Sequence, residues 1–234
     1  MTEATPMHHD VSNGRALAFH DNACHGEDAF VIRELTSQMA LDAVLDGATA
    51  RGGREASSHA AAMLREACVT GVDSLVAILD RANGELFRRG RGRFFLTTVS
   101  VALKIDQELH VFSIGDSPVL LIRSGDIVPL TPAGRGQAFI GIANALGRHE
   151  RLAYKTTHTR LQPNDCLALM TDGVLENVAP TELAVLVGEA ASPEQAVSNL
   201  GRLLDLKRGQ NKGRIDERTG FRHDDATAIF RYFR

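Results

Sequence analysis

The fold of this chain is restricted most by the order of its apolar runs. Short runs end at turn residues: residues 39–45 stop at Asp46-Gly47, and residues 118–123 and 127–130 flank Ser124-Gly125-Asp126. Runs joined by such short turns pair as antiparallel strands, because a parallel pair needs a crossover of about a dozen residues. We expect strands over residues 15–19, 29–34, 39–45, 94–105, 108–114, 118–123, 127–130, 154–159, 166–170 and 226–233.

Apolar residues recur at helical spacing in other segments. In residues 73–87, for example, Leu75, Leu79 and Leu86 fall on one helical face. We expect helices over residues 54–69, 73–87, 181–190 and 193–206. These helices come in two pairs between groups of strands, which argues against a parallel sheet built from βαβ units. The predicted fold is an α+β sandwich of two antiparallel β-sheets flanked by helices on the outer faces, with an antiparallel meander over residues 94–130.

The length and composition are typical of one globular domain. Of the 234 residues, 44% are hydrophobic and 24% are charged, which excludes a disordered or collagen-like chain. We expect a flexible N-terminal segment over residues 1–14 and a single domain over residues 15–234. The net charge of −3 gives no overall attraction to nucleic acid or to an anionic membrane, so we expect neither as a partner.

Three sequence features favour a cytoplasmic location. The first residues lack the basic start and the apolar stretch of a secretory signal. No run approaches the roughly 18 apolar residues that a membrane helix needs. The cysteines, Cys24, Cys68 and Cys166, are odd in number and too far apart to indicate a disulfide framework or a zinc ribbon.

Acidic residues stand where the expected strands stop. They are Glu27-Asp28, Asp46-Gly47, Asp116, Asp172-Gly173 and Asp224-Asp225. An isolated Asp-Gly pair is usually no more than a turn. Several carboxylates at one sheet edge, however, would raise each other's pKa values unless a cation neutralised them. Oxygen ligands of this kind favour a hard ion, Mg²⁺ or Mn²⁺, over zinc.

The order and the neighbours of these acids resemble the metal-dependent protein phosphatase family of type 2C, also called PPM-type. The similarity extends from about residue 15 to residue 233 and rests on eight short motifs in family order. The motifs are Gly26-Glu27-Asp28, Asp46-Gly47 with Gly52-Gly53, Leu96-Thr97-Thr98, Gly115-Asp116-Ser117, Leu130-Thr131-Pro132, Ala145-Leu146-Gly147, Thr171-Asp172-Gly173 and Asp224-Asp225-Ala226-Thr227.

The resemblance implies that four residues bind metal. Asp46 would bridge two ions, the carbonyl oxygen of Gly47 would bind one of them, and Asp172 and Asp224 would bind the other. Two such Mg²⁺ or Mn²⁺ ions, about 3.5–4 Å apart, would lower the pKa of a water between them and stabilise charge on the phosphoryl oxygens. Asp116 would touch a third, weaker ion.

The other implied roles concern water and substrate. Glu27 and Asp28 would hold water bound to the ions. The reaction would be the hydrolysis of phosphoserine and phosphothreonine in proteins. The partners would then be a phosphoprotein and the serine/threonine kinase that modifies it.

Two departures from the family pattern concern the substrate site. The family usually has an arginine a few residues before Glu-Asp that holds substrate phosphate, whereas residues 20–25 contain none. The loop after Gly47 is longer and carries Arg51 and Arg54, either of which could replace the missing guanidinium. Residues 131–147 leave almost no room for the flap of many members, which indicates a minimal, flap-less bacterial form.

A second hypothesis stays open beside the enzyme. The missing arginine and the altered glycine loop favour a pseudophosphatase, a catalytically weak or inactive module that regulates partners through its surface. Asp46, Asp172 and Asp224 oppose this hypothesis, because folding alone gives little reason to gather acids that repel one another.

Other polar residues are assigned no site. The four arginines in residues 88–93 are interpreted as a solvated turn, although such a cluster could attract a phosphopeptide or RNA. His20 and His25 are interpreted as surface histidines, either of which could protonate the leaving alcohol. Cys24 and Cys166 have no predicted base beside them and are interpreted as packing residues.

Overall fold

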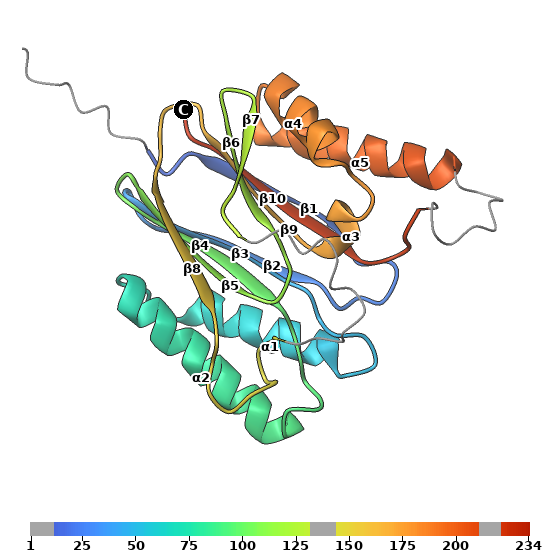
Figure 1. Ribbon diagram of the computed structural model, residues 1–234. Coiled ribbons are helices and arrows are strands. Elements are labelled where there is room, and N and C mark those ends of the chain that lie inside the picture. Colours follow the sequence, from blue (N-terminus) through green and yellow to red (C-terminus); the bar gives the residue numbers. More distant parts are fainter. Residues whose placement is uncertain (1–11, 132–143, 211–220) are drawn as a thin grey trace, which may run out of the picture.

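Two five-stranded antiparallel sheets pack face to face, and helices cover both outer faces (Figure 1). The computed structural model describes residues 12–131, 144–210 and 221–234. The predicted α+β sandwich is confirmed.

Each sheet is assembled from distant parts of the chain. The first has the order β1-β10-β9-β6-β7, and the second has the order β2-β3-β4-β5-β8. The strands of the first are β1 (Arg15–Asp21), β6 (Val119–Arg123), β7 (Asp126–Pro129), β9 (Cys166–Met170) and β10 (Ala226–Tyr232). The strands of the second are β2 (Ala29–Thr36), β3 (Met39–Leu45), β4 (Val99–Ile105), β5 (Glu108–Ile114) and β8 (Lys155–Arg160).

The helices pack in pairs, one pair on each sheet. Helices α1 (Gly53–Glu66) and α2 (Val72–Gly90) cover the second sheet, and α4 (Pro180–Glu189) and α5 (Pro193–Gln210) cover the first. A short helix, α3 (Asp172–Leu175), directly follows β9. In α1 the buried residues Ala56, Ala60 and Leu64 recur every four positions, so one face of the helix packs on the sheet.

Three apolar layers result, one between the sheets and one under each helix pair. Strand β3 shows how the sequence specifies two of them. Leu41, Ala43 and Leu45 pack in the layer under α1 and α2, whereas Val44 packs between the sheets. Successive side chains of a strand point to opposite faces, so a strand covered on both faces is mostly apolar, and in β3 only Asp42 is charged.

A buried ion pair joins the two sheets. Arg231 of β10 donates from Nε to Asp42 Oδ2 over 2.6 Å and from Nη2 to Asp42 Oδ1 over 2.8 Å, and Asp42 belongs to β3. The Nη1 group of Arg231 also donates to the carbonyl oxygen of Asn13 and to Glu34 Oε1. Burial alone would lower the pKa of Arg231, but its hydrogen bonds and ion pairs with Asp42 and Glu34 hold that pKa above its usual value.

The two main differences from the expectations concern residues 94–130. The meander over residues 94–130 is wrong, because β4 and β5 lie in the second sheet and β6 and β7 in the first. The chain crosses between the sheets at Ser117, whose carbonyl oxygen accepts from Ser100 Oγ over 2.6 Å and whose hydroxyl lies 2.9 Å from Thr98 Oγ1. The expected strand at residue 94 begins only at Val99, because Phe95 has a φ of 54°, which a strand cannot contain.

Two segments for which the sequence led to a prediction lie largely outside the described residues. They are the N-terminal segment 1–14, of which residues 1–11 are not described, and the flap position, of which residues 132–143 are not described. Within the described ranges, no helix is both long enough and apolar enough to cross a membrane.

Candidate active site

Carboxylates from three strand ends gather at one edge of the sandwich. Asp46 follows β3, Asp172 follows β9, and Asp224 precedes β10. The pKa of Asp46 is raised well above its usual value by burial and then by the charges of Asp172, Asp28, Asp224 and Asp116, in that order. The structure therefore brings the predicted acids close enough to repel one another.

Backbone contacts fix the Asp46-Gly47 turn. The Asp46 carbonyl oxygen accepts from the Thr98 amide and from Thr97 Oγ1, both over 2.8 Å. The Gly47 amide donates to the carbonyl oxygen of Glu27. A side chain at Gly47 would collide with the backbone of Gly53, so this close approach requires glycine.

Asp28 is buried and held by two hydroxyl groups. Its Oδ2 accepts from Thr171 Oγ1 over 2.9 Å and from Thr227 Oγ1 over 2.7 Å. Burial raises the pKa of Asp28 to about 7; the two hydroxyls oppose this shift, and the charges of Asp225 and Asp172 add to it. Asp28 thus takes up a proton more readily than an ordinary aspartate.

Asp172 begins α3 and is half-buried. Burial, followed by the charges of Asp224, Asp116 and Glu176, raises the pKa of Asp172 to about 7. Asp116 is exposed in the crossing between β5 and β6. Its charge nevertheless acts on both Asp46 and Asp172.

Asp225 holds the loop before β2, a role that the sequence analysis missed. Its Oδ1 accepts from the amides of Cys24 and His25, and its Oδ2 accepts from the amide of Glu27 over 2.7 Å. Burial alone would raise the pKa of Asp225, but the backbone donors at Glu27, His25, Gly26 and Cys24 lower it overall. The only sequence signal for this role was the presence of two adjacent acids, Asp224 and Asp225.

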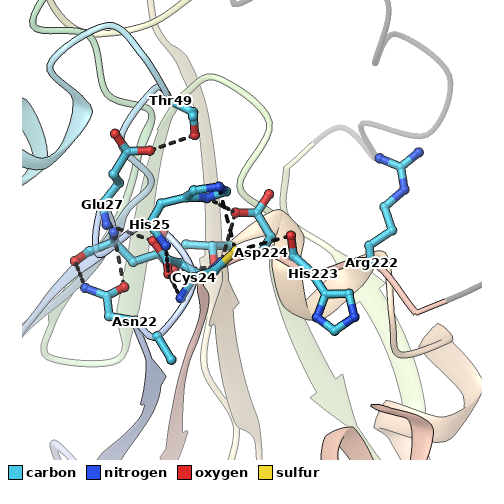
Figure 2. Close-up of polar contacts among 12 residues, drawn as sticks. Asn22, Cys24, His25, Glu27, Thr49, Arg222, His223 and Asp224 are labelled. Carbon is cyan, nitrogen blue, oxygen red and sulfur yellow. Dashed lines mark hydrogen bonds and ion pairs between the residues drawn. The ribbon is translucent and has the colours of Figure 1, made fainter. Parts of the chain in front are cut away.

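Glu27 is positioned by contacts with the loop that follows Gly47 and with α1. Its Oε2 accepts from Thr49 Oγ1 over 2.6 Å (Figure 2). Its carbonyl oxygen accepts from Ser57 Oγ over 2.5 Å. Neither Thr49 nor Ser57 belongs to a motif that the sequence singled out. The roles of Thr49 and Ser57 could be recognised only from the fold, which places both residues beside Glu27.

The structure separates the two arginines of the lengthened loop. Arg54 donates from Nη2 to the carbonyl oxygen of His25 over 2.6 Å, and its guanidinium packs against Gly26, where any side chain would collide with it. Arg51 instead donates from Nη1 to the carbonyl oxygen of Arg93 over 3.3 Å. Arg54 therefore borders the loop that carries Glu27, whereas Arg51 lies toward the turn after α2.

The two histidines also take different positions. His25 places Nδ1 3.3 Å from Asp224 Oδ1, and Figure 2 shows the ring beside that carboxylate. His20 places Nδ1 2.9 Å from Thr227 Oγ1. Cys24 does have a base nearby, because its Sγ lies 3.7 Å from His25 Nε2. Burial and then the charges of Asp224, Asp225 and Asp21 raise the pKa of Cys24, however, which disfavours a thiolate nucleophile.

The chemistry of the donor set fits a hard divalent cation. It consists of aspartates that raise each other's pKa, together with the Gly47 carbonyl oxygen, to which no described residue donates a hydrogen bond. Among the residues described, no three His, Cys, Asp or Glu side chains stand close enough together to enclose an ion. The carboxylates would have to move closer together to share one.

The fold is shared with solved structures, a serine/threonine phosphatase among them. The chain resembles PppA, a key regulatory component of T6SS in Pseudomonas aeruginosa, at 22% identity and a TM-score of 0.79, covering 96% of this chain and 100% of PppA. It resembles the serine/threonine phosphatase Stp1 from Staphylococcus aureus at 20% identity and a TM-score of 0.77, covering 94% and 95%. It resembles RsbX in complex with magnesium at 17% identity and a TM-score of 0.68, covering 96% and 100%.

The fold and the order of the acid motifs are those of the PP2C-like, or PPM-type, class. Within this class, the family model for Stage II sporulation protein E (SpoIIE) matches residues 53–230, and the chain belongs to that family. The matched range includes Asp116, Asp172 and Asp224. A search of curated protein sequences finds no match.

We expect Asp46→Asn to raise the melting temperature in chelator. An acid whose pKa is raised in the folded state destabilises that state once it is ionised, so removing its charge at neutral pH relieves repulsion. The rise should be about 2–4 °C, which corresponds to roughly 1 kcal/mol for a chain of this size. With added Mn²⁺ the wild type should have the higher melting temperature of the two, because bound metal stabilises it more than it stabilises Asp46→Asn. A lower melting temperature of Asp46→Asn in chelator would instead make Asp46 chiefly a structural turn residue.

Proposed function

We propose that this protein hydrolyses phosphoserine and phosphothreonine in other proteins, with Mg²⁺ or Mn²⁺ as cofactor. The observation that carries the proposal is the group of mutually repelling aspartates at one edge of a PP2C-like sandwich. Repulsion of this kind makes such a group a site for cations. The substrate would be a cytoplasmic phosphoprotein, modified by a serine/threonine kinase in the same compartment.

Different acidic residues of the chain would bind each of two ions. Asp46 would bind both, the Gly47 carbonyl oxygen one of them, and Asp172 and Asp224 the other, with Asp116 beside a third. When bound, the ions would supply a water of lowered pKa and positive charge for the phosphoryl oxygens. Hydrogen bonds from Thr97 and Thr98, and one to the Glu27 carbonyl oxygen, would hold the Asp46-Gly47 turn in place for this binding.

Other residues would orient the reactants. Asp28, fixed by Thr171 and Thr227, would accept a hydrogen bond from water at the site. Asp225 would keep the loop of residues 24–27 in place, and with it Glu27 and His25. His25 is exposed and contacts Asp224, so its protonated ring would be the acid that donates a proton to the leaving seryl or threonyl oxygen.

The test is hydrolysis of a small phosphate ester and of a phosphoserine peptide, in Mn²⁺ and in chelator. The proposal predicts turnover of both substrates that requires the metal. The pseudophosphatase hypothesis is favoured by residues 20–25, which lack an arginine, and predicts no turnover with Mn²⁺ or Mg²⁺. If the folded protein shows no metal-dependent turnover, the pseudophosphatase hypothesis is correct and the proposed function is wrong.

We expect Arg54→Ala to lower kcat/KM about 10- to 100-fold, because a guanidinium that forms charge-assisted hydrogen bonds to phosphate contributes roughly 1.5–3 kcal/mol. KM should rise, while the Mn²⁺ concentration for half-maximal activity should change little. Arg51→Ala should have a smaller effect, since Arg51 contacts the Arg93 carbonyl oxygen. The matched control is Arg81→Ala, which removes an exposed arginine of α2. If Arg54→Ala behaves like Arg81→Ala, Arg54 does not hold the substrate phosphate.

A further inference from the structure

Exposed arginines from two separate segments of the chain gather around the turn that follows α2. Arg89 lies in α2, Arg91 and Arg93 lie in the turn, and Arg148 lies after Leu146, and all four are exposed. Arg148 reaches the turn by donating from Nη1 to the carbonyl oxygen of Gly92 over 2.8 Å. We call these four residues, together with Phe94, the arginine turn.

The charges of the arginine turn are not neutralised within the described part of the chain. None of its four guanidinium groups forms an ion pair there, whereas Arg123, Arg208 and Arg231 each pair with an aspartate. Arg89 instead stacks over the Phe95 ring at 4.3 Å from its centroid. The arginine turn is thus a positively charged patch on a chain whose net charge is −3.

The arginine turn is held in a defined conformation. Asn83 of α2 donates to the carbonyl oxygens of His149 and Glu150 and accepts from the amide of Gly147, which fixes the segment on both sides of Arg148. Arg91 and Phe95 both have positive φ, 50° and 54°. Such backbone is unfavourable for residues other than glycine and is frequent at binding sites.

An aromatic ring is exposed among these charges. Phe94 is 51% exposed, which is unusual for a phenylalanine and places an apolar contact beside the arginines. A ring that stays in water next to guanidinium groups is typical of surfaces that bind another polypeptide, where aromatic and arginine side chains are enriched.

The arginine turn adjoins the candidate active site. The Phe95 amide donates to the carbonyl oxygen of Arg51 over 2.5 Å, and the Ala48 amide donates to that of Leu96 over 2.9 Å. Arg51 is only five residues after Asp46, so at most about 18 Å of chain separates the two. In Figure 1, the start of α1 and the end of α2 lie at the same end of the helical layer.

We propose that the arginine turn binds an acidic segment of the phosphoprotein substrate, within about five residues of the phosphorylated side chain. This inference rests on the proposed function, because it names the class of substrate for that site. Phe94 would pack against an apolar residue of the same segment.

The structure favours an acidic polypeptide over RNA. Single-stranded RNA is usually bound by several aromatic rings in succession, and the arginine turn exposes one, Phe94.

The test compares two phosphoserine peptides that differ only in their flanking residues, glutamates in one and glutamines in the other. The full chain with Mn²⁺ is assayed on both peptides and on a small phosphate ester. The variant is Arg91→Gln/Arg93→Gln, which removes charge but keeps size. The matched control is Arg202→Gln, which changes an exposed arginine on α5.

The wild type should prefer the acidic peptide roughly fivefold in kcat/KM, since each exposed ion pair contributes a fraction of a tenfold factor. The double variant should lose this preference, mainly through KM, and should hydrolyse the small ester as the wild type does. The control should keep the preference. Salt at about 0.5 M should also remove it in the wild type, because exposed charges are screened.

Three results would overturn the inference: a wild type without preference, a double variant that keeps it, or an RNA oligonucleotide that displaces the acidic peptide at lower concentration than a polyglutamate peptide does. Fluorescence anisotropy of the labelled peptides measures docking without turnover. If the small ester is not hydrolysed with either metal, the proposed function fails, while anisotropy still decides whether the arginine turn selects the acidic peptide.

Discussion

Asp172→Asn is expected to abolish Mn²⁺-dependent turnover and to leave the protein folded. The substitution keeps the shape of the side chain but removes one of the charges that would hold a cation at the end of β9. Loss of one strong electrostatic contact in an active site typically lowers kcat about 10²- to 10³-fold, and removing a ligand to the ions should do at least this. Steady-state kinetics on a phosphoserine peptide over a range of Mn²⁺ concentrations measures the effect.

The fold of Asp172→Asn should survive because repulsion is relieved. Burial and the charges of Asp224 and Asp116 raise the pKa of Asp172 to about 7, so its ionised form is unfavourable in the metal-free protein. The matched control is Asp126→Asn, which changes an exposed aspartate in β7. Kinetics close to wild type for Asp172→Asn at saturating Mn²⁺ would remove Asp172 from the metal site.

The largest loss of stability is expected from Asp42→Asn. Asp42 is 2% exposed, and its two oxygens accept from Nε and Nη2 of Arg231. In asparagine, one of these oxygens becomes an NH₂ group that faces a donor. The buried guanidinium then loses the negative charge that offsets the cost of its burial. Breaking a buried pair in this way costs about 3–5 kcal/mol, or roughly 6–20 °C in melting temperature for this size of chain.

Glu34 limits the loss, because it still accepts from Arg231 Nη1 over 2.7 Å. The companion Arg231→Met/Asp42→Leu replaces the whole pair with apolar side chains and should recover much of the stability. Thermal and urea unfolding in chelator compare the variants with wild type. If Asp42→Asn unfolds within about 1 kcal/mol of wild type, the pair between the sheets contributes little to stability.

Much of the fold could be predicted because its signals are local. The runs at residues 39–45 and 166–170 are apolar apart from Asp42, and each stops within one residue of an Asp-Gly pair. They form β3 and β9 with the predicted bounds. The crossing at Ser117 could not be predicted in the same way. It depends on hydroxyls of Thr98 and Ser100, which reach Ser117 only once β4 and β5 have paired.

The candidate site was predictable where an acidic residue stands beside the start or the end of a strand. Asp46, Asp172 and Asp224 each occupy such a position, and the structure brings their charges together. The contacts of Asp225, Thr49 and Ser57 were missed because each joins segments far apart in the chain. The choice between Arg51 and Arg54 also needed the fold, since both are exposed and they stand only three residues apart.

The central claim, that these aspartates bind the ions of a phosphatase, is tested most directly by diffraction from crystals soaked in Mn²⁺. Data collected on both sides of the manganese absorption edge locate the ions without relying on activity. The account predicts anomalous peaks beside Asp46, shared with the Gly47 carbonyl oxygen on one side and with Asp172 and Asp224 on the other. A well-ordered structure at millimolar Mn²⁺ with no peak among these residues would contradict it.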